Sequence, residues 1–256
     1  MSTWLLLFRK EMLESARNFK WIWIPLVFLA LGISNPITSY YMPEILQAGG
    51  VTAEAAKLIP MPTSEEIIVK SLSQYGTIGL LVFALSFMGI VAGERQSGSA
   101  IMVLVKPVSH VHYITSKWAT MTAITLAAVT LGQLGTGYYM SVLFDDNVYS
   151  EVLVSGLVYA LWLVLINSIT LLLSCLMKAQ AGIAFVAVAF AALLSLVTGL
   201  LGDVMRWSPS RLTAEAGRIV KEGGAGDDLW LLVLITAALI AIILSFATAA
   251  SRRMLR

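Results

Sequence analysis

Six long stretches of this sequence contain no charged residue, and charged residues border each of them. Every stretch holds at least 23 residues. About 20 apolar residues, at a rise of about 1.5 Å each, cross the hydrocarbon core of a bilayer as a helix. Only a helix or a closed barrel satisfies the backbone amides there. The pattern therefore predicts an all-α integral membrane protein with six transmembrane helices, at about 21–42, 71–93, 118–143, 152–176, 180–202 and 229–250.

Basic residues are divided unequally between the two sides of these predicted spans. With the N-terminus placed inside, the inner segments hold 11 Lys and Arg residues and the outer segments hold 6. Short loops rich in Lys and Arg stay on the cytoplasmic side of a membrane. We therefore expect a multi-pass protein of the cell membrane with both termini in the cytoplasm (N-in, C-in).

The residues before the first span have an amphipathic pattern and predict a helix over 3–20. Apolar side chains share one side of this helix, and most charged side chains fall elsewhere. Such a helix lies in the inner membrane interface, with its basic side chains near anionic lipid headgroups. A solvated extension of the first span is the alternative. The residues on which the interfacial helix depends are Trp4, Phe8, Arg9, Lys10 and Phe19.

Two predicted outer segments have helix signals of their own. The outer loop 43–70 contains Thr63 and Glu66 at the spacing of a capping box, so the second helix should begin near Ser64. The outer element 203–228 contains Pro209 and ends at Gly223-Gly224, which predicts a short helix. This helix is either a small cap on the protein or an ordinary loop helix.

Composition limits the remaining chemistry. Only 12% of the residues are charged and 58% are hydrophobic, where a soluble domain has about 25% charged residues. We therefore expect one transmembrane domain over 1–256, with no soluble catalytic domain and no nucleic-acid partner. The lone Cys175 excludes an intramolecular disulfide, and no set of residues has metal-ligand spacing.

The six predicted spans contain neutral polar residues but no carboxylate or histidine in their cores. Intramembrane hydrolases and ion-coupled carriers commonly hold ionisable groups at that depth, so neither class is favoured. Gln133 and Asn167 lie near the centres of the third and fourth predicted spans. Their amides either join helices to one another or line a substrate path.

The inner loop between the second and third spans, 94–117, has a distinctive order of residues. It begins with Glu94-Arg95, turns at Gly98, continues as an apolar helix over 100–105, and breaks at Lys106-Pro107. A short apolar helix with charged flanks at the membrane surface is suited to docking a cytoplasmic partner.

This loop resembles the corresponding loop of the permease subunits of type-2 ABC transporters, also called type V exporters. The layout resembles theirs as well, with an amphipathic N-terminal helix, six spans and a short outer helix before the last span. Ser99, His110 and Ser116 depart from the family pattern, in which threonine, arginine and glycine are usual. The matching residues are Glu94-Arg95, Gly98-Ser99, Met102, Leu104, Pro107-Val108-Ser109, Tyr113 and Lys117.

The resemblance implies a permease subunit of an ATP-driven exporter that is moved by separate ATPase subunits. The phosphate-binding pattern G-x-x-x-x-G-K-[ST] does not occur in this sequence, so ATP and Mg would be bound by the partner and no cofactor by this chain. Two ATPase copies and a second permease, identical or related, are implied. The residues expected to couple to the ATPase are Glu94, Arg95, Gly98, Ser99, Met102, Leu104 and Pro107.

Two other functional classes stay open at this point. One is a membrane sensor or assembly protein, whose ligand would contact the outer element 203–228. The other is a membrane-embedded lipid-modifying enzyme.

Overall fold

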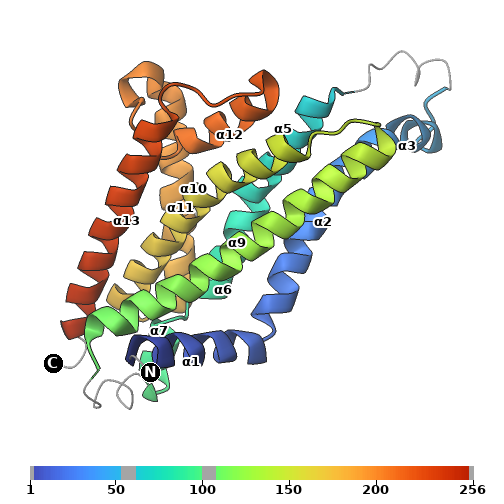
Figure 1. The fold of residues 1–256 in the computed structure, drawn as a ribbon. Coiled ribbons are helices and arrows are strands. Elements are labelled where there is room, and N and C mark those ends of the chain that lie inside the picture. The colour runs from blue at the N-terminus through green and yellow to red at the C-terminus, as the bar shows by residue number, and fades with distance from the viewer. Residues whose placement is uncertain (1–2, 53–61, 100–107, 254–256) are drawn as a thin grey trace.

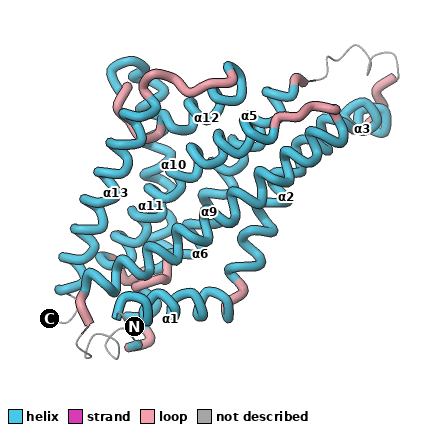
Figure 2. Tube along the Cα trace, viewed as in Figure 1, coloured by secondary structure: helices cyan, strands magenta, loops and turns pink. Residues whose placement is uncertain are grey.

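A computed structural model of the chain describes residues 3–52, 62–99 and 108–253, and within these ranges it contains helices and turns but no strand. The long helices run beside one another along the protein (Figure 1), and the loops between them lie mostly at its two ends (Figure 2). This confirms the prediction of an all-α membrane protein. The continuous long helices are α2 (Lys20–Tyr40), α9 (His110–Leu143), α10 (Tyr149–Leu176), α11 (Gln180–Leu201) and α13 (Leu229–Arg252).

The second predicted span is made of several consecutive pieces. Outside this span, the shorter helices that the structure describes are α1 (Thr3–Arg17), α3 (Met42–Ala48), a 3-10 turn η2 (Gly202–Met205) and α12 (Arg211–Glu222). The pieces of the second span are α5 (Ser64–Gln74), a π-helical turn η1 (Tyr75–Gly79), α6 (Leu80–Phe87) and α7 (Ala92–Gln96).

Within the described ranges, five helical stretches are long and apolar enough to cross a membrane. They are Lys20–Tyr40, Ser64–Gln96, Tyr149–Leu176, Gln180–Leu201 and Leu229–Arg252. Although α9 has 34 residues, it is not among them, and its many Thr and Gly residues and Gln133 dilute its apolar content. The count of six spans and the side on which the termini lie therefore stay predictions.

Both termini lie at the same end of the bundle (Figure 1). We call this end, where α1, α7 and the last turn of α13 meet, the terminus end; it is the end predicted to face the cytoplasm. The opposite end, where α12 lies, is the α12 end. At the terminus end, the His110 ring is 3.1 Å from the Ser251 hydroxyl, which joins the start of α9 to the end of α13.

The most extensive contact between two described helices is that of α2 with α9, and it depends on small residues. A Cβ atom on Gly32 would lie 2.3 Å from the carbonyl oxygen of Gly132, far inside normal contact. The Thr136 hydroxyl donates to the Gly32 carbonyl at 3.0 Å. Gly132 and Thr136 therefore form a close-approach surface for packing within the chain, as small residues do between membrane helices.

The α12 end contains the helix signals that the sequence predicts. Thr63 and Glu66 form a complete capping box at the start of α5, and α12 ends at Gly223, whose φ of 67° is a left-handed cap. One side of α12 is buried against α10 and α5, through Leu212, Ala216, Ile219 and Val220. This supports the interpretation of the outer element as a cap on the bundle.

Candidate coupling site at the terminus end

Three elements bring charged side chains together inside the terminus end. Glu11 comes from α1, Glu94 from α7 and Lys117 from the second turn of α9, and their exposed fractions are 5%, 7% and 0%. The Lys117 ammonium is 2.9 Å from a carboxylate oxygen of Glu11 and 2.9 Å from one of Glu94. We call Lys10, Glu11, Glu94 and Lys117 the buried ion-pair cluster, in which Lys10 lies at the edge with 39% of its side chain exposed.

The four residues of the cluster carry two positive and two negative charges, and the half-exposed carboxylate of Glu14 contacts Lys10 from outside it. Lys10 pairs with Glu94 and is 2.9 Å from Glu11, so two ammonium groups face two carboxylates. The Tyr113 hydroxyl donates to the second carboxylate oxygen of Glu94, and the Lys117 ammonium lies 5.0 Å from the centre of the Tyr113 ring. Burial disfavours the charged form of Lys10, but the carboxylates of Glu11 and Glu94 outweigh this and raise its pKa above the ordinary value. Buried charges persist only when they are paired and hydrogen-bonded in this way.

The carboxylates here have the spacing of a metal site, but lysine already holds them. Ligand atoms of Glu11, Glu14 and Glu94 lie within 4.8 Å of one another. The ammonium of Lys10 pairs with all three, at 2.9 Å from Glu11 and 3.1 Å from Glu14. Since a cation already occupies the position that a metal ion would need, we interpret the group as an ion-pair network.

A break in the helix lies directly beside the cluster, between α6 and α7. The residues 88–91 form turns rather than helix. The backbone amides of Val91 and Ala92 donate to the hydroxyl of Ser174 on α10, at 3.1 and 2.9 Å, and that hydroxyl donates to the carbonyl of Met88 at 3.0 Å. Lys20 donates to the carbonyl of Ser86 at 2.7 Å. Side chains thus satisfy the backbone groups that the break releases, which lets it exist at membrane depth.

The structure places four of the seven predicted coupling residues. Glu94 is inside the cluster, so its side chain does not form part of an exposed docking surface. Arg95 donates to the carbonyl of Cys175 at 3.0 Å. Gly98 has a φ of 75°, a left-handed conformation that ends α7 and its following turn, and the Ser99 hydroxyl is 2.9 Å from that of Ser97. Met102, Leu104, Pro107 and the helix predicted over 100–105 lie outside the described residues.

The N-terminal helix differs in part from its prediction. It ends at Arg17, and Phe19 lies in a left-handed turn before α2 with 65% of its surface exposed. Trp4 and Phe8 stack with ring centres 5.3 Å apart, and Trp4 donates to Thr115 of α9 at 3.1 Å. Arg9 is exposed, whereas Lys10 joins the cluster. The buried residue of α1 is Glu11, which the amphipathic pattern did not single out.

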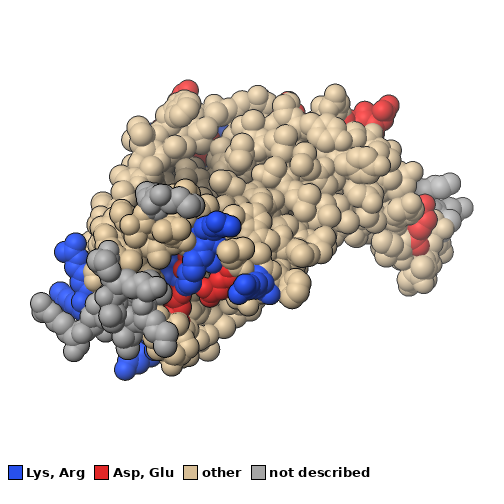
Figure 3. Space-filling model, turned by 60° about the horizontal axis from the view of Figure 1, so that its bottom comes forward, with Lys and Arg blue, Asp and Glu red and all other residues tan. Residues whose placement is uncertain are grey.

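Basic and acidic side chains gather at the terminus end, and the long flank of the bundle is almost free of them (Figure 3). This distribution fits a bundle whose sides face lipid and whose end faces water.

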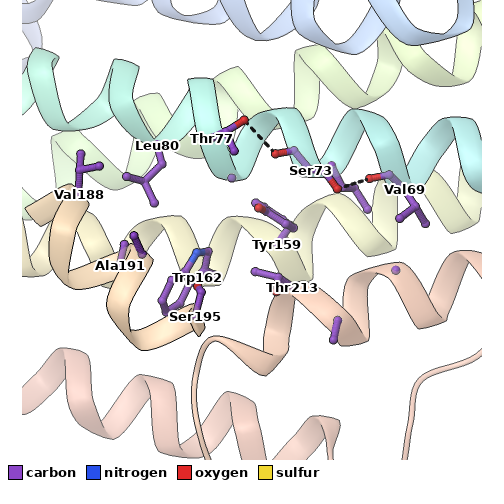
Figure 4. Close-up of a pocket in the computed structure, with 15 residues that line it drawn as sticks. Val69, Ser73, Thr77, Leu80, Tyr159, Trp162, Val188, Ala191, Ser195 and Thr213 are labelled. Atoms are coloured by element: carbon purple, nitrogen blue, oxygen red, sulfur yellow. Dashed lines mark hydrogen bonds between the residues drawn. The ribbon is translucent and has the colours of Figure 1, made fainter. Parts of the chain in front are cut away.

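A cavity of about 610 Å³ lies towards the α12 end, between the second span, α10, α11 and α12. Figure 4 shows Tyr159 and Trp162 of α10 on one side and Ser73 and Thr77 of the second span across from them. Most other lining residues are small, so helix faces rather than bulky side chains form the walls. The small lining residues are Gly76, Ala191, Ala192, Ser195, Thr213, Ala214 and Gly217, and the larger ones are Val69, Leu72, Leu80 and Val188.

The amides of Asn167 and Gln133 lie away from this cavity. Asn167 donates to Thr125 of α9 at 2.8 Å, so it joins α10 to α9. Gln133 is buried against Gly156, and neither atom of its amide has a hydrogen-bond partner among the described residues. Neither amide lines the cavity, and the Asn167 contact favours a packing role.

Comparisons with known proteins agree with this architecture. The sequence model described as "ABC-2 family transporter protein" matches residues 5–209. The chain is also 32% identical over 228 residues to a Bacillus subtilis protein described as the uncharacterized transmembrane protein YxlG. That alignment covers 89% of this chain and 88% of the relative.

Proposed function

This chain belongs to the ABC-2 family of transporter proteins, and from that membership we propose that it is a permease subunit whose terminus end is moved by separate ATPase subunits to drive export. The observation that carries this proposal is the buried ion-pair cluster beside the break in the second span. The cluster joins the segment that leads to the inner loop to two further elements, α1 and α9.

The coupling would begin at the inner loop. An ATPase subunit docked below Gly98 pushes on the short helix α7, which can turn relative to α6 because residues 88–91 are not helical. Since Glu94 is paired with Lys117 and Lys10, a displacement of α7 moves α9 and α1 with it. A buried ion pair transmits such a displacement well, because separating its charges would leave them uncompensated.

The cavity near the α12 end is the proposed part of the substrate path in this subunit. Its walls combine apolar residues with Ser, Thr and Tyr, which suits an amphiphilic substrate. A second permease, identical or related, would complete the path. Outward opening of that path would release the substrate.

The partner is the first thing to test. The sequence has no phosphate-binding loop, so two copies of an ATPase subunit would bind ATP and Mg for the complex. We expect a tagged copy of this chain, extracted from its native membranes, to copurify with a Walker-motif protein. Purification of the chain alone under conditions that preserve known membrane complexes would contradict the proposal.

The turn at Gly98 provides a test of the coupling path. We expect Gly98→Leu to reduce ATP hydrolysis stimulated by the permease, because leucine strains a left-handed φ of 75° and the chain must leave α7 in another direction. Gly98→Asn is the matched control, since asparagine tolerates this conformation. ATPase activity of the reconstituted complex is the measurement, and membrane insertion should not change. Equal activity of the two variants would contradict a role for this turn.

The cavity provides a second test. In a strain that lacks the wild-type gene, we expect the Ser195→Trp variant to fail to restore transport, because the indole ring would fill space between α11 and α10. Leu193→Trp is the matched control on the same helix, at a side chain that is 61% exposed and outside the cavity lining. Both variants should reach the membrane at wild-type levels. Full activity of Ser195→Trp would exclude the cavity from the substrate path.

A further inference from the structure

A second groove lies at the terminus end, between α7, α10 and the end of α13. Its volume is about 480 Å³. Its floor is apolar and formed by Leu172, Leu176, Phe246, Ala249 and Ala250, with Cys175 beside them. The groove exists because two consecutive alanines on α13 leave space that larger side chains would fill.

Two arginines from different elements border this groove. Arg95 belongs to α7, and Arg253 follows the last residue of α13. No acidic residue is among the eight residues that line the groove. The neighbouring Glu94 contacts α1 and α9 through the buried ion-pair cluster, whereas Arg95 contacts α10.

The position of the arginines also fits a membrane surface. Arg95 donates one hydrogen bond to the carbonyl of Cys175, one residue before the end of α10 at Leu176. A guanidinium group carries five N–H donors in a planar fork that matches the oxygens of a phosphate. Arg253 is exposed at the end of α13. Both cations thus lie where the apolar floor ends and the headgroup region begins.

We propose that this groove binds an anionic phospholipid of the inner leaflet, with its phosphate between Arg95 and Arg253 and an acyl chain along Ala249 and Ala250. The two arginines favour a ligand with a negatively charged headgroup, and the apolar floor favours a ligand with a hydrocarbon chain. Basic pockets between transmembrane helices on the cytoplasmic side commonly recognise anionic lipids in this way.

The proposal can be tested on the full-length protein in nanodiscs that contain equal amounts of phosphatidylglycerol and phosphatidylcholine. Native mass spectrometry measures which lipid remains bound after the protein is released from the nanodisc. We expect wild-type protein to retain phosphatidylglycerol preferentially. Arg253→Gln should lower that preference about fivefold, the usual effect of one basic residue near an anionic surface. In the double variant Arg95→Gln with Arg253→Gln, the ratio of retained phosphatidylglycerol to retained phosphatidylcholine should be close to one.

Two further variants separate a specific groove from general attraction. Lys178→Gln removes an exposed charge at the same end but outside the groove, so it should leave the preference unchanged. Ala249→Trp fills the floor without a change of charge and should reduce retention of phosphatidylglycerol. Because Arg253→Gln leaves the contact of Arg95 with α10 intact, its result does not depend on the stability of the double variant.

Three results would overturn the proposal. The first is a preference that survives removal of both arginines, and the second is an equal loss in Lys178→Gln. The third is displacement of the bound lipid by inorganic phosphate at equal concentration, which would mean that the hydrocarbon chain contributes nothing. The experiment needs no ATPase partner, so its outcome is independent of the proposed transport function.

Discussion

Replacement of Lys117 by methionine is expected to lower the free energy of unfolding by about 3–5 kcal/mol, the usual effect of removing one partner from a buried ion pair. Lys117 has no exposed surface and contacts the carboxylates of Glu11 and Glu94 at 2.9 Å each. Methionine has a similar length but no charge. The two carboxylates would then share the single ammonium of Lys10, and one negative charge would stay buried without compensation.

Thermal unfolding of the purified protein in detergent measures this effect. Lys70→Met is the control, because Lys70 is exposed on the second span, away from the cluster. The double variant Glu94→Gln with Lys117→Met restores a balance of one positive and one negative charge, so it should recover part of the loss. An unchanged melting temperature for Lys117→Met would contradict the buried ion-pair cluster, and so would a double variant as unstable as the sum of the single ones.

The second large effect is expected at the contact between α2 and α9. Gly32→Ala should destabilise the protein by about 1–3 kcal/mol, as overpacking of a well-packed contact does. The added methyl group would lie 2.3 Å from the carbonyl oxygen of Gly132, and backbone cannot rotate away as a side chain can. The two helices would have to separate, which would also weaken the bond from Thr136 to the Gly32 carbonyl.

The same substitution at Gly199 of α11 is expected to have the opposite effect on stability. No atom lies within 4 Å of a Cβ built on Gly199. Gly199→Ala should therefore stabilise the helix by about 0.5–1 kcal/mol, through the lower conformational entropy of alanine in the unfolded chain. Unfolding of both variants in the same detergent gives a direct comparison. A melting temperature for Gly32→Ala at or above that of Gly199→Ala would refute the close packing of α2 on α9.

Much of the fold could be predicted from short local patterns in the sequence. The start of α5 was predictable because Thr63 and Glu66 make a capping box from residues three positions apart in one segment. The end of α12 at Gly223 was predictable because few other residues adopt its left-handed conformation. The π-helical turn that begins at Tyr75 could not be predicted, since this turn depends on how α2 and α10 pack against the second span.

The candidate site was predictable only in part. Glu94 and Arg95 were identified from a resemblance, but that resemblance does not indicate their partners. Lys10 is 84 residues from Glu94 and Cys175 is 80 residues from Arg95. Glu11 was missed because the prediction for the first helix depended on its apolar and basic side chains. A signal was present, since Glu11 follows Trp4 by about two helical turns and so lies close to the apolar side.

The break at 88–91 could not be predicted from its own residues. It requires the hydroxyl of Ser174, which is more than 80 residues further along the chain and accepts from Val91 and Ala92. Serine is common in membrane helices, and its partner becomes apparent only in three dimensions.

The order of the cluster along the chain has a consequence for biosynthesis. A ribosome makes Lys10 and Glu11 before any span, Glu94 in the last piece of the second span, and Lys117 just before the predicted third span. Until Lys117 arrives, α1 has no complete site in which to bury Glu11. If the third span entered the membrane in the wrong direction, Lys117 would be at the far side and α1 could not dock. Docking of the first helix would therefore report that the first three predicted spans have been inserted correctly.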